Sequence, residues 1–158
     1  MKYGRFSNDG KEYVINRIDI PRPWINYLSN DRYCALVSHT GGGYSFYESS
    51  GYDRILREYP GETLRIGRPG RHLYIKDLES GQYWSPNGFL DGNQFKAWEC
   101  RHGLGYTRVS TRQFDIEHQI TYFVPLHDNC ELWMVRIKNK SGKTRRLRVF
   151  PYVEWCLG

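Results

Sequence analysis

The stretch CELWMVRIKNKSGKTRRLRVFPYVEW (130–155) decides the fold class of this chain. Apolar residues recur at every second position in both of its halves, at Trp133, Val135, Ile137, Leu147, Val149 and Val153. A period of two is typical of a β-strand that buries one face. The KSGK sequence between the halves is rich in turn residues, so the stretch predicts two strands joined as an antiparallel hairpin.

The same pattern extends toward the N-terminus. Segment 114–124 places its apolar residues on one side, at Ile116, Ile120, Tyr122 and Val124. Two further pairs of short strands are expected, HLYIKD (72–77) with QYWS (82–85) across LESG, and YCALVSH (33–39) with YSFY (44–47) across Gly41–Gly43. No window carries a helical stripe, and the sequence therefore predicts an all-β, antiparallel β-sandwich of roughly ten strands.

Length and composition bound the classes of protein to consider. The 158 residues suffice for one domain, and an aromatic share of 16% argues against disorder. The net charge is +6, but the cations are scattered, with the densest runs at Arg65, Arg68 and Arg71 and at Arg145, Arg146 and Arg148. We interpret these runs as solvated faces, and we expect no nucleic-acid partner.

Targeting signals are not visible in the sequence. The opening MKYGRFSNDG has no apolar core segment, and no stretch approaches the apolar length that spans a bilayer. We therefore expect a cytoplasmic protein without membrane contact. The four cysteines are far apart and are expected to be reduced thiols among apolar neighbours, at Cys34, Cys100, Cys130 and Cys156. No Cys or His spacing supports a zinc site.

The C-terminus indicates an incomplete domain. The sequence ends at PYVEWCLG, an aromatic strand with no turn or polar tail behind it. A domain rarely ends in this way. We therefore expect residues 1–158 to be the N-terminal sandwich portion of something longer, truncated at its C-terminal end.

Gly41–Gly43 raise the question of a phosphate-binding loop. Such a loop needs a closing Lys-Ser/Thr and a helix whose N-terminal amides face the anion. Tyr44 follows the glycines instead, and the next residues read as a strand. The sequence therefore favours a tight connection in which glycine permits positive φ or close backbone approach, with Gly42 as the residue expected at positive φ.

Other residue types that could carry chemistry have simpler interpretations. The sequence pattern places no nucleophile beside any of the five histidines. They are His39, His72, His102, His118 and His127. Asp115 and Glu117 are two apart and could share a strand face as a general acid/base pair, although exposed carboxylates are the simpler interpretation. Seven aromatic residues could form a platform on which sugar rings stack, although such residues more often fill a core or an interface. They are Trp24, Tyr27, Tyr44, Phe46, Tyr47, Trp84 and Trp98.

Long gapped motifs resemble those of a known family. They are MKYGRFSNDGKEYVINRIDIPRPWINYL (1–28), SHTGGGYSFY (38–47), YIKD (74–77) with YWS (83–85), ECRHGLGYT (99–107) and YFVPLHDNCELWMVRIKNKSGKTRRLRVFPYVEW (122–155). In this order and spacing, the chain resembles the cellobiose and chitobiose phosphorylases of glycoside hydrolase family 94. The likeness covers essentially the whole chain.

The resemblance implies an inverting phosphorolysis of a β-linked disaccharide to an α-sugar 1-phosphate. An aspartic acid protonates the glycosidic oxygen while inorganic phosphate attacks the anomeric carbon, following the logic of an inverting glycosidase. In the family, a β-supersandwich precedes an (α/α)6 barrel that carries this aspartate and the phosphate site. That barrel is absent from this chain.

The resemblance therefore assigns no catalytic, cofactor-binding or metal residue to positions 1–158. It implies no cofactor besides phosphate as co-substrate, a homodimer, and an isolated chain that is inactive. The sequence does not select the disaccharide, although cellobiose and chitobiose are both suggested. A free-standing carbohydrate-binding β-sandwich remains the main alternative, and a basic nucleic-acid binder is a weaker one.

Overall fold

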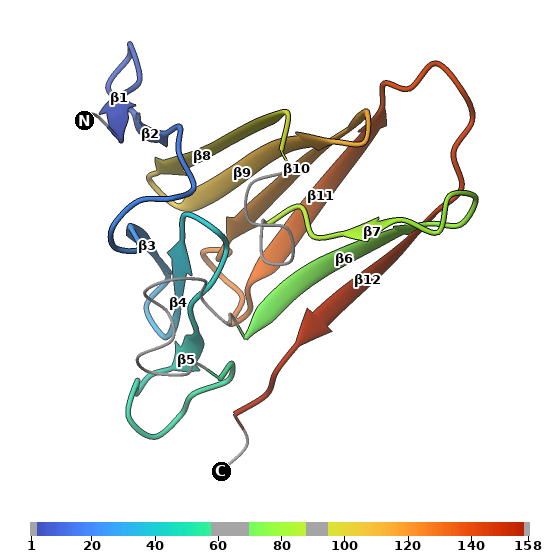
Figure 1. The fold of residues 1–158 in the computed structure, drawn as a ribbon. Helices are drawn as coiled ribbons and strands as arrows, with labels where there is room; N and C mark the ends of the chain where they lie inside the picture. Colours follow the sequence, from blue (N-terminus) through green and yellow to red (C-terminus); the bar gives the residue numbers. More distant parts are fainter. Residues whose placement is uncertain (1–2, 58–69, 88–94, 157–158) are drawn as a thin grey trace.

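The computed structural model describes residues 3–57, 70–87 and 95–156, and in these ranges the chain consists of β-strands and connections (Figure 1). The strands form three sheets in which all hydrogen-bonded neighbours are antiparallel. The described part of the chain holds no helix long and apolar enough to cross a membrane. The all-β, antiparallel prediction is confirmed.

The largest sheet has six strands in the order β1-β2-β8-β9-β10-β11. Its members are β1 (Gly4–Phe6), β2 (Glu12–Ile15), β8 (Ala97–Gly103), β9 (Tyr106–Gln113), β10 (Ile116–Phe123) and β11 (Leu132–Asn139). Side chains alternate strictly between buried and half-buried along β9. The apolar side chains of 114–124 that were expected to share a side are buried in β10 and just beyond it, at Ile116, Ile120, Tyr122 and Val124.

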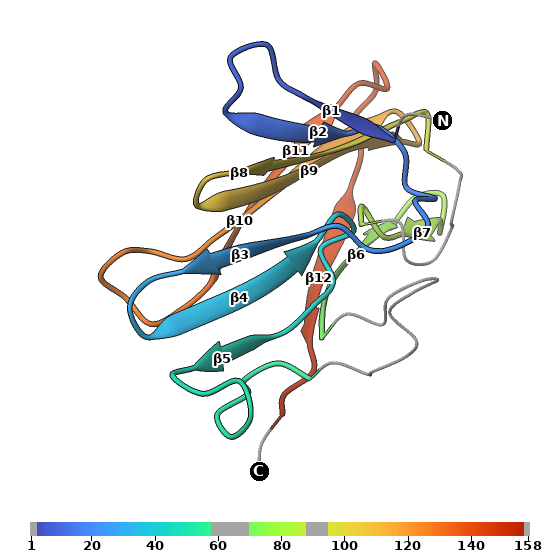
Figure 2. The same cartoon turned by 90° about the vertical axis from the view of Figure 1, so that its left-hand side faces the viewer.

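Two three-stranded sheets lie on the other side of the core (Figures 1 and 2). One has the order β3-β4-β5 and contains β3 (Ile25–Ser29), β4 (Tyr33–Ser38) and β5 (Ser45–Tyr47). The other has the order β12-β6-β7 and contains β6 (Arg71–Asp77), β7 (Tyr83–Trp84) and β12 (Leu147–Val153). The β4–β5 and β6–β7 pairs are those that the sequence predicted.

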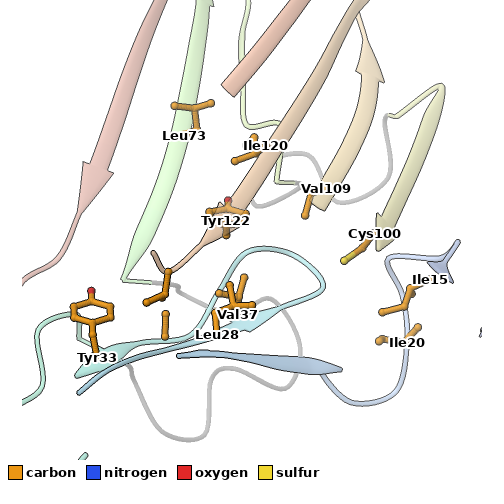
Figure 3. Packing of buried hydrophobic residues seen from close by; sticks show 12 residues of the cluster. Ile15, Ile20, Leu28, Tyr33, Val37, Leu73, Cys100, Val109, Ile120 and Tyr122 are labelled. Carbon is orange, nitrogen blue, oxygen red and sulfur yellow. The ribbon is translucent and has the colours of Figure 1, made fainter. Parts of the chain in front are cut away.

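One buried apolar cluster joins the sheets into a sandwich (Figure 3). Val109 and Ile120 of the six-stranded sheet lie opposite Leu28 and Val37 of the sheet β3-β4-β5. Burial of such side chains is the main favourable contribution to folding. A second, smaller cluster joins β6, β7 and β10 through Ile75, Trp84 and Ile116.

The predicted hairpin between β11 and β12 is wrong. β11 pairs with β10, whereas β12 pairs with β6 in a different sheet, with Leu147 opposite Asp77. Arg145 lies where the chain passes from one sheet to the other. Its Nε donates to Asp77 Oδ2 at 2.6 Å and its Nη1 donates to the Phe114 carbonyl at 3.2 Å. An apolar period of two shows which side chains share one face of a strand, and it does not show which strand lies beside it.

Candidate functional site

The glycine loop, Gly41–Gly43, is a tight connection between β4 and β5. The φ angles of Gly41 and Gly43 are 80° and 117°, while Gly42 is not among the residues with positive φ. A Cβ at Gly43 would lie 2.2 Å from the Leu36 carbonyl oxygen. The Gly41 amide donates to the Ser38 carbonyl at 2.9 Å, so this amide is used inside the loop. The structural interpretation is confirmed, but the expectation of positive φ at Gly42 is wrong.

A buried ion pair lies beneath this loop. Arg71 is completely buried, and its Nε and Nη2 donate to the two carboxylate oxygens of Glu131, each at 2.8 Å. Its Nη1 donates to the Leu36 carbonyl at 2.9 Å and to the Gly41 carbonyl at 3.4 Å. Trp133 Nε1 also donates to Glu131, at 2.6 Å. The pair therefore connects β6, β4 and the start of β11, and these donors are committed to protein atoms rather than a ligand.

The interpretation of the two arginine runs as solvated faces is therefore only partly correct. Arg71 is buried, and the Arg145 side chain is 8% exposed and paired with Asp77. Arg146 and Arg148 are exposed as predicted. Arg65 and Arg68 lie outside the described residues. A sequence run of like charge does not show which member has an acidic partner in the fold.

Three histidines have structural partners in the interior. Burial lowers the pKa of His102 and of His118 to about 4, so both are neutral at pH 7. His118 Nε2 accepts a hydrogen bond from Trp84 Nε1 at 3.1 Å, and His102 Nδ1 lies 3.0 Å from Thr107 Oγ1. Burial also lowers the pKa of His39, whose Nε2 lies 3.1 Å from the Ile18 carbonyl.

The remaining two histidines differ in solvent exposure. His72 is buried, and its ring stacks on Tyr74 at 5.6 Å between centroids. His127 is exposed in the connection that follows β10.

Asp115 and Glu117 do not form the strand pair that their spacing suggested. Asp115 lies in the turn between β9 and β10 with a φ of 58°, and only Glu117 belongs to a strand. The Lys96 ammonium, 2.9 Å away, lowers the pKa of Asp115. Glu117 lies 3.6 Å from Lys140 Nζ. Both carboxylates are thus partly exposed members of ion pairs.

The seven aromatic residues singled out in the sequence do not form one platform. Trp84 is fully buried, and Trp24 and Trp98 pack against the main core. Tyr44 and Tyr47 lie beneath the guanidinium groups of Arg54 and Arg32, respectively.

A second aromatic surface, which the sequence did not indicate, lies on the sheet β12-β6-β7. The outward face of the sheet β12-β6-β7 carries Tyr74 opposite Phe150, and Tyr83 opposite Lys76. We call this surface the aromatic face, and it comprises His72, Tyr74, Lys76, Tyr83, Arg148, Phe150 and Tyr152. Tyr83 and Tyr152 are 67% and 46% exposed. Ring faces beside cationic donors are suited to stacking and hydrogen bonding with a sugar.

The outward face of the six-stranded sheet carries a hollow of about 670 Å³. Its charged lining residues are Glu99, Arg112, Glu117, Arg136 and Lys138, which come from β8, β9, β10 and β11. Within the described ranges, no group of three His, Cys, Asp or Glu side chains is placed to hold a metal ion.

Comparison with known proteins gives consistent matches over the chain. The family model for the glycosyl hydrolase 94 supersandwich domain matches residues 11–158. An N,N'-diacetylchitobiose phosphorylase of Vibrio proteolyticus is 42% identical over 98% of this chain. A solabiose phosphorylase of Paenibacillus borealis is 33% identical over 98%, and the cyclic beta-(1,2)-glucan synthase NdvB of Rhizobium meliloti (strain 1021) is 33% identical over 99%.

The matched region is a small part of each relative. This chain spans 19% of the length of the chitobiose phosphorylase, 20% of the solabiose phosphorylase and 6% of the glucan synthase.

Proposed function

Because the chain belongs to the glycosyl hydrolase 94 supersandwich family, we propose that it is the sandwich portion of an enzyme that cleaves a β-linked disaccharide with inorganic phosphate. The observation that carries this proposal is the identity to proteins named as phosphorylases over nearly the whole chain. Fold alone would not justify it, since one fold hosts many functions.

The proposed role of residues 1–158 is to support the catalytic part rather than to perform the chemistry. The donors of Arg71 are used on protein atoms, and His102 and His118 are neutral and hydrogen-bonded in the interior. An inverting phosphorolysis needs one general acid and a site for phosphate. We propose that both lie in a helical barrel outside this chain, and that phosphate is a co-substrate with no further cofactor.

The substrate that we propose is N,N'-diacetylchitobiose. Two relatives with this name are 42% and 41% identical to the chain, against 33% for the solabiose phosphorylase. Because proteins with differently named substrates share this domain, we further propose that the residues that select the sugar lie elsewhere. The accompanying expectations are a cytoplasmic, homodimeric enzyme.

The alternative is a carbohydrate-binding module that acts without a catalytic partner. The aromatic face favours this alternative, because Tyr83 and Tyr152 present exposed rings near Lys76 and Arg148. Both functions could use the same sugars, but only an enzyme consumes phosphate.

We expect the full-length protein that contains this chain to convert N,N'-diacetylchitobiose and phosphate into a sugar 1-phosphate and N-acetylglucosamine. The product should carry the α configuration, because a single displacement inverts the β-linked anomeric carbon. Phosphorus and proton NMR of the reaction mixture would measure both features. Cellobiose and solabiose serve as comparison substrates. Consumption of none of these sugars, with sugar binding retained, would favour the binding module.

A further inference from the structure

Two cations lie directly opposite each other on the aromatic face. Lys76 of β6 is paired in register with Arg148 of β12, and both side chains are exposed. Within residues 3–57, 70–87 and 95–156, no ion pair involves either of them. Like charges directly opposite on neighbouring strands are unfavourable. An anion bound between the two side chains would replace this repulsion with two charge-assisted contacts.

The protein supplies no anion to this cation pair. The acidic residues that flank the pair in the sequence each have an arginine partner elsewhere, in the ion pairs Asp77–Arg145, Glu79–Arg146 and Glu154–Arg57. The residues that make up the aromatic face include no aspartate or glutamate. The face therefore presents two positive charges that are complementary to an anionic ligand.

Exposed rings lie beside the cation pair. Tyr83 of β7 lies directly opposite Lys76, so Tyr83, Lys76 and Arg148 form one row across three strands. Figure 1 shows β6 between β7 and β12 in this sheet. Phe150 lies on the same face, two residues along β12 from Arg148, which is about 6.6 Å along a strand. Tyr83 and Phe150 are 67% and 43% exposed, so a ligand that reaches the cations meets aromatic rings beside them.

The rings next to Phe150 are packed against one another. The His72 ring stacks on Tyr74 and contacts Tyr152, with centroids 5.6 and 5.9 Å apart, respectively. Tyr74 and Tyr152 make an edge contact with centroids 6.5 Å apart. Tyr74 also lies directly opposite Phe150. These contacts hold part of the face in place before a ligand arrives, which lowers the entropy cost of binding.

We propose that the aromatic face binds an acidic saccharide. Its carboxylate or phosphate lies between Lys76 and Arg148, and its sugar ring packs on Phe150, with Tyr83 on the other side of the anion. Arg148 suits this role because a planar guanidinium donates two parallel hydrogen bonds to a carboxylate or phosphate. A pyranose ring offers C–H groups that pack on an aromatic side chain. The inference concerns residues of this chain alone and does not rest on phosphorolysis.

The distribution of charge favours a short ligand over single-stranded nucleic acid. Nucleic acids also stack on aromatic rings, but their repeated phosphates need cations along a whole groove. On the aromatic face the cations are confined to the row of Lys76 and Arg148, and the other residues are aromatic. One pair of cations matches a ligand with one anionic group.

The test is a lysine-acetylation footprint of the full-length protein that contains this chain, in phosphate-free buffer. Cellobiouronic acid supplies the carboxylate, N-acetylglucosamine 1-phosphate supplies the phosphate, and cellobiose is the neutral control. With a saturating acidic probe, mass spectrometry should show Lys76 acetylated several-fold more slowly. Lys138, which is exposed on β11, is the matched control and should react at an unchanged rate. The acidic probe that protects Lys76 identifies the anion.

Three variants separate the parts of this site. Arg148→Gln and Phe150→Ala should each raise the probe concentration that protects Lys76 about tenfold. Tyr27→Ala removes a ring of similar exposure, 62%, from β3 and should leave protection unchanged. Arg148→Gln should not lower the melting temperature, because it removes a like charge opposite Lys76. An arginine with a merely structural role would lower it.

Each other result overturns the proposal. Unchanged acetylation of Lys76 with both acidic probes shows that the face binds neither anion. Equal protection by cellobiose shows that the cation pair takes no part in binding. Equal slowing at Lys138 shows a nonspecific effect of the probe. Protection by a thymidine oligonucleotide, but by neither acidic saccharide, assigns the face to nucleic acid. None of these measurements depends on turnover of a disaccharide, so they are independent of the proposed reaction.

Discussion

Arg71→Met is expected to destabilise the fold by about 3–5 kcal/mol, which is the usual cost of breaking a buried ion pair. The substitution leaves Glu131, whose side chain is 11% exposed, without its bidentate partner. It also removes the donor to the carbonyls of Leu36 and Gly41 at the glycine loop. Urea unfolding followed by tryptophan fluorescence measures the loss.

Two further variants isolate the cause. Arg32→Met breaks the ion pair with Glu48, whose side chains are 58% and 51% exposed, and should have only a marginal effect. Replacing both partners, in Arg71→Met with Glu131→Leu, should recover part of the loss because no unpaired charge remains buried. Equal losses for Arg71→Met and Arg32→Met would contradict a structural role for the buried pair.

Mild acid is expected to destabilise the chain between about pH 6.5 and 4. Burial lowers the pKa of His118 to about 4 in the folded state, whereas the unfolded histidine titrates near its ordinary value of 6.5. In this window the unfolded state binds more protons, so stability falls as pH falls. A lowering from 6.5 to about 4 corresponds to a loss on the order of 3 kcal/mol for this one residue.

Urea unfolding at several pH values between 7 and 4 would measure this dependence. His118→Gln keeps an acceptor for Trp84 Nε1 but cannot become charged. It should make the pH dependence less steep by the share of His118, while the shares of His102 and His39 remain. His127→Gln, at an exposed position, is the matched control and should leave the slope unchanged. The account fails if His118→Gln retains the full acid dependence.

Strands and their buried faces could be predicted from the sequence, but long-range partners could not. The apolar period of two correctly indicated the buried face of β10, and short turns correctly joined β6 to β7, whereas no side chain of β12 is buried and Val149 is 40% exposed. β12 pairs with β6, and the Arg145–Asp77 ion pair beside this ladder joins residues far apart in the sequence. Charge runs likewise did not show that Arg71 is buried against Glu131.

The candidate surfaces could be predicted only in part. Asp115 was placed on a strand because its neighbours alternate, yet the turn between β9 and β10 includes it. The aromatic face was missed because β12, which carries Phe150 and Tyr152, was expected to pair with β11, whereas it pairs with β6. A usable signal was present, since Phe150 and Tyr152 alternate along the strand with Val149 and Val153, whose side chains lie on the other face.

The central claim is that these 158 residues supply a sandwich and none of the catalytic groups. Phosphorus NMR of the isolated chain with N,N'-diacetylchitobiose and phosphate tests it most directly, beside the full-length protein under the same conditions. The account predicts sugar 1-phosphate from the full-length protein and none above a buffer blank from the isolated chain. Sugar 1-phosphate formed by the isolated chain, in a preparation free of host enzyme, would contradict it.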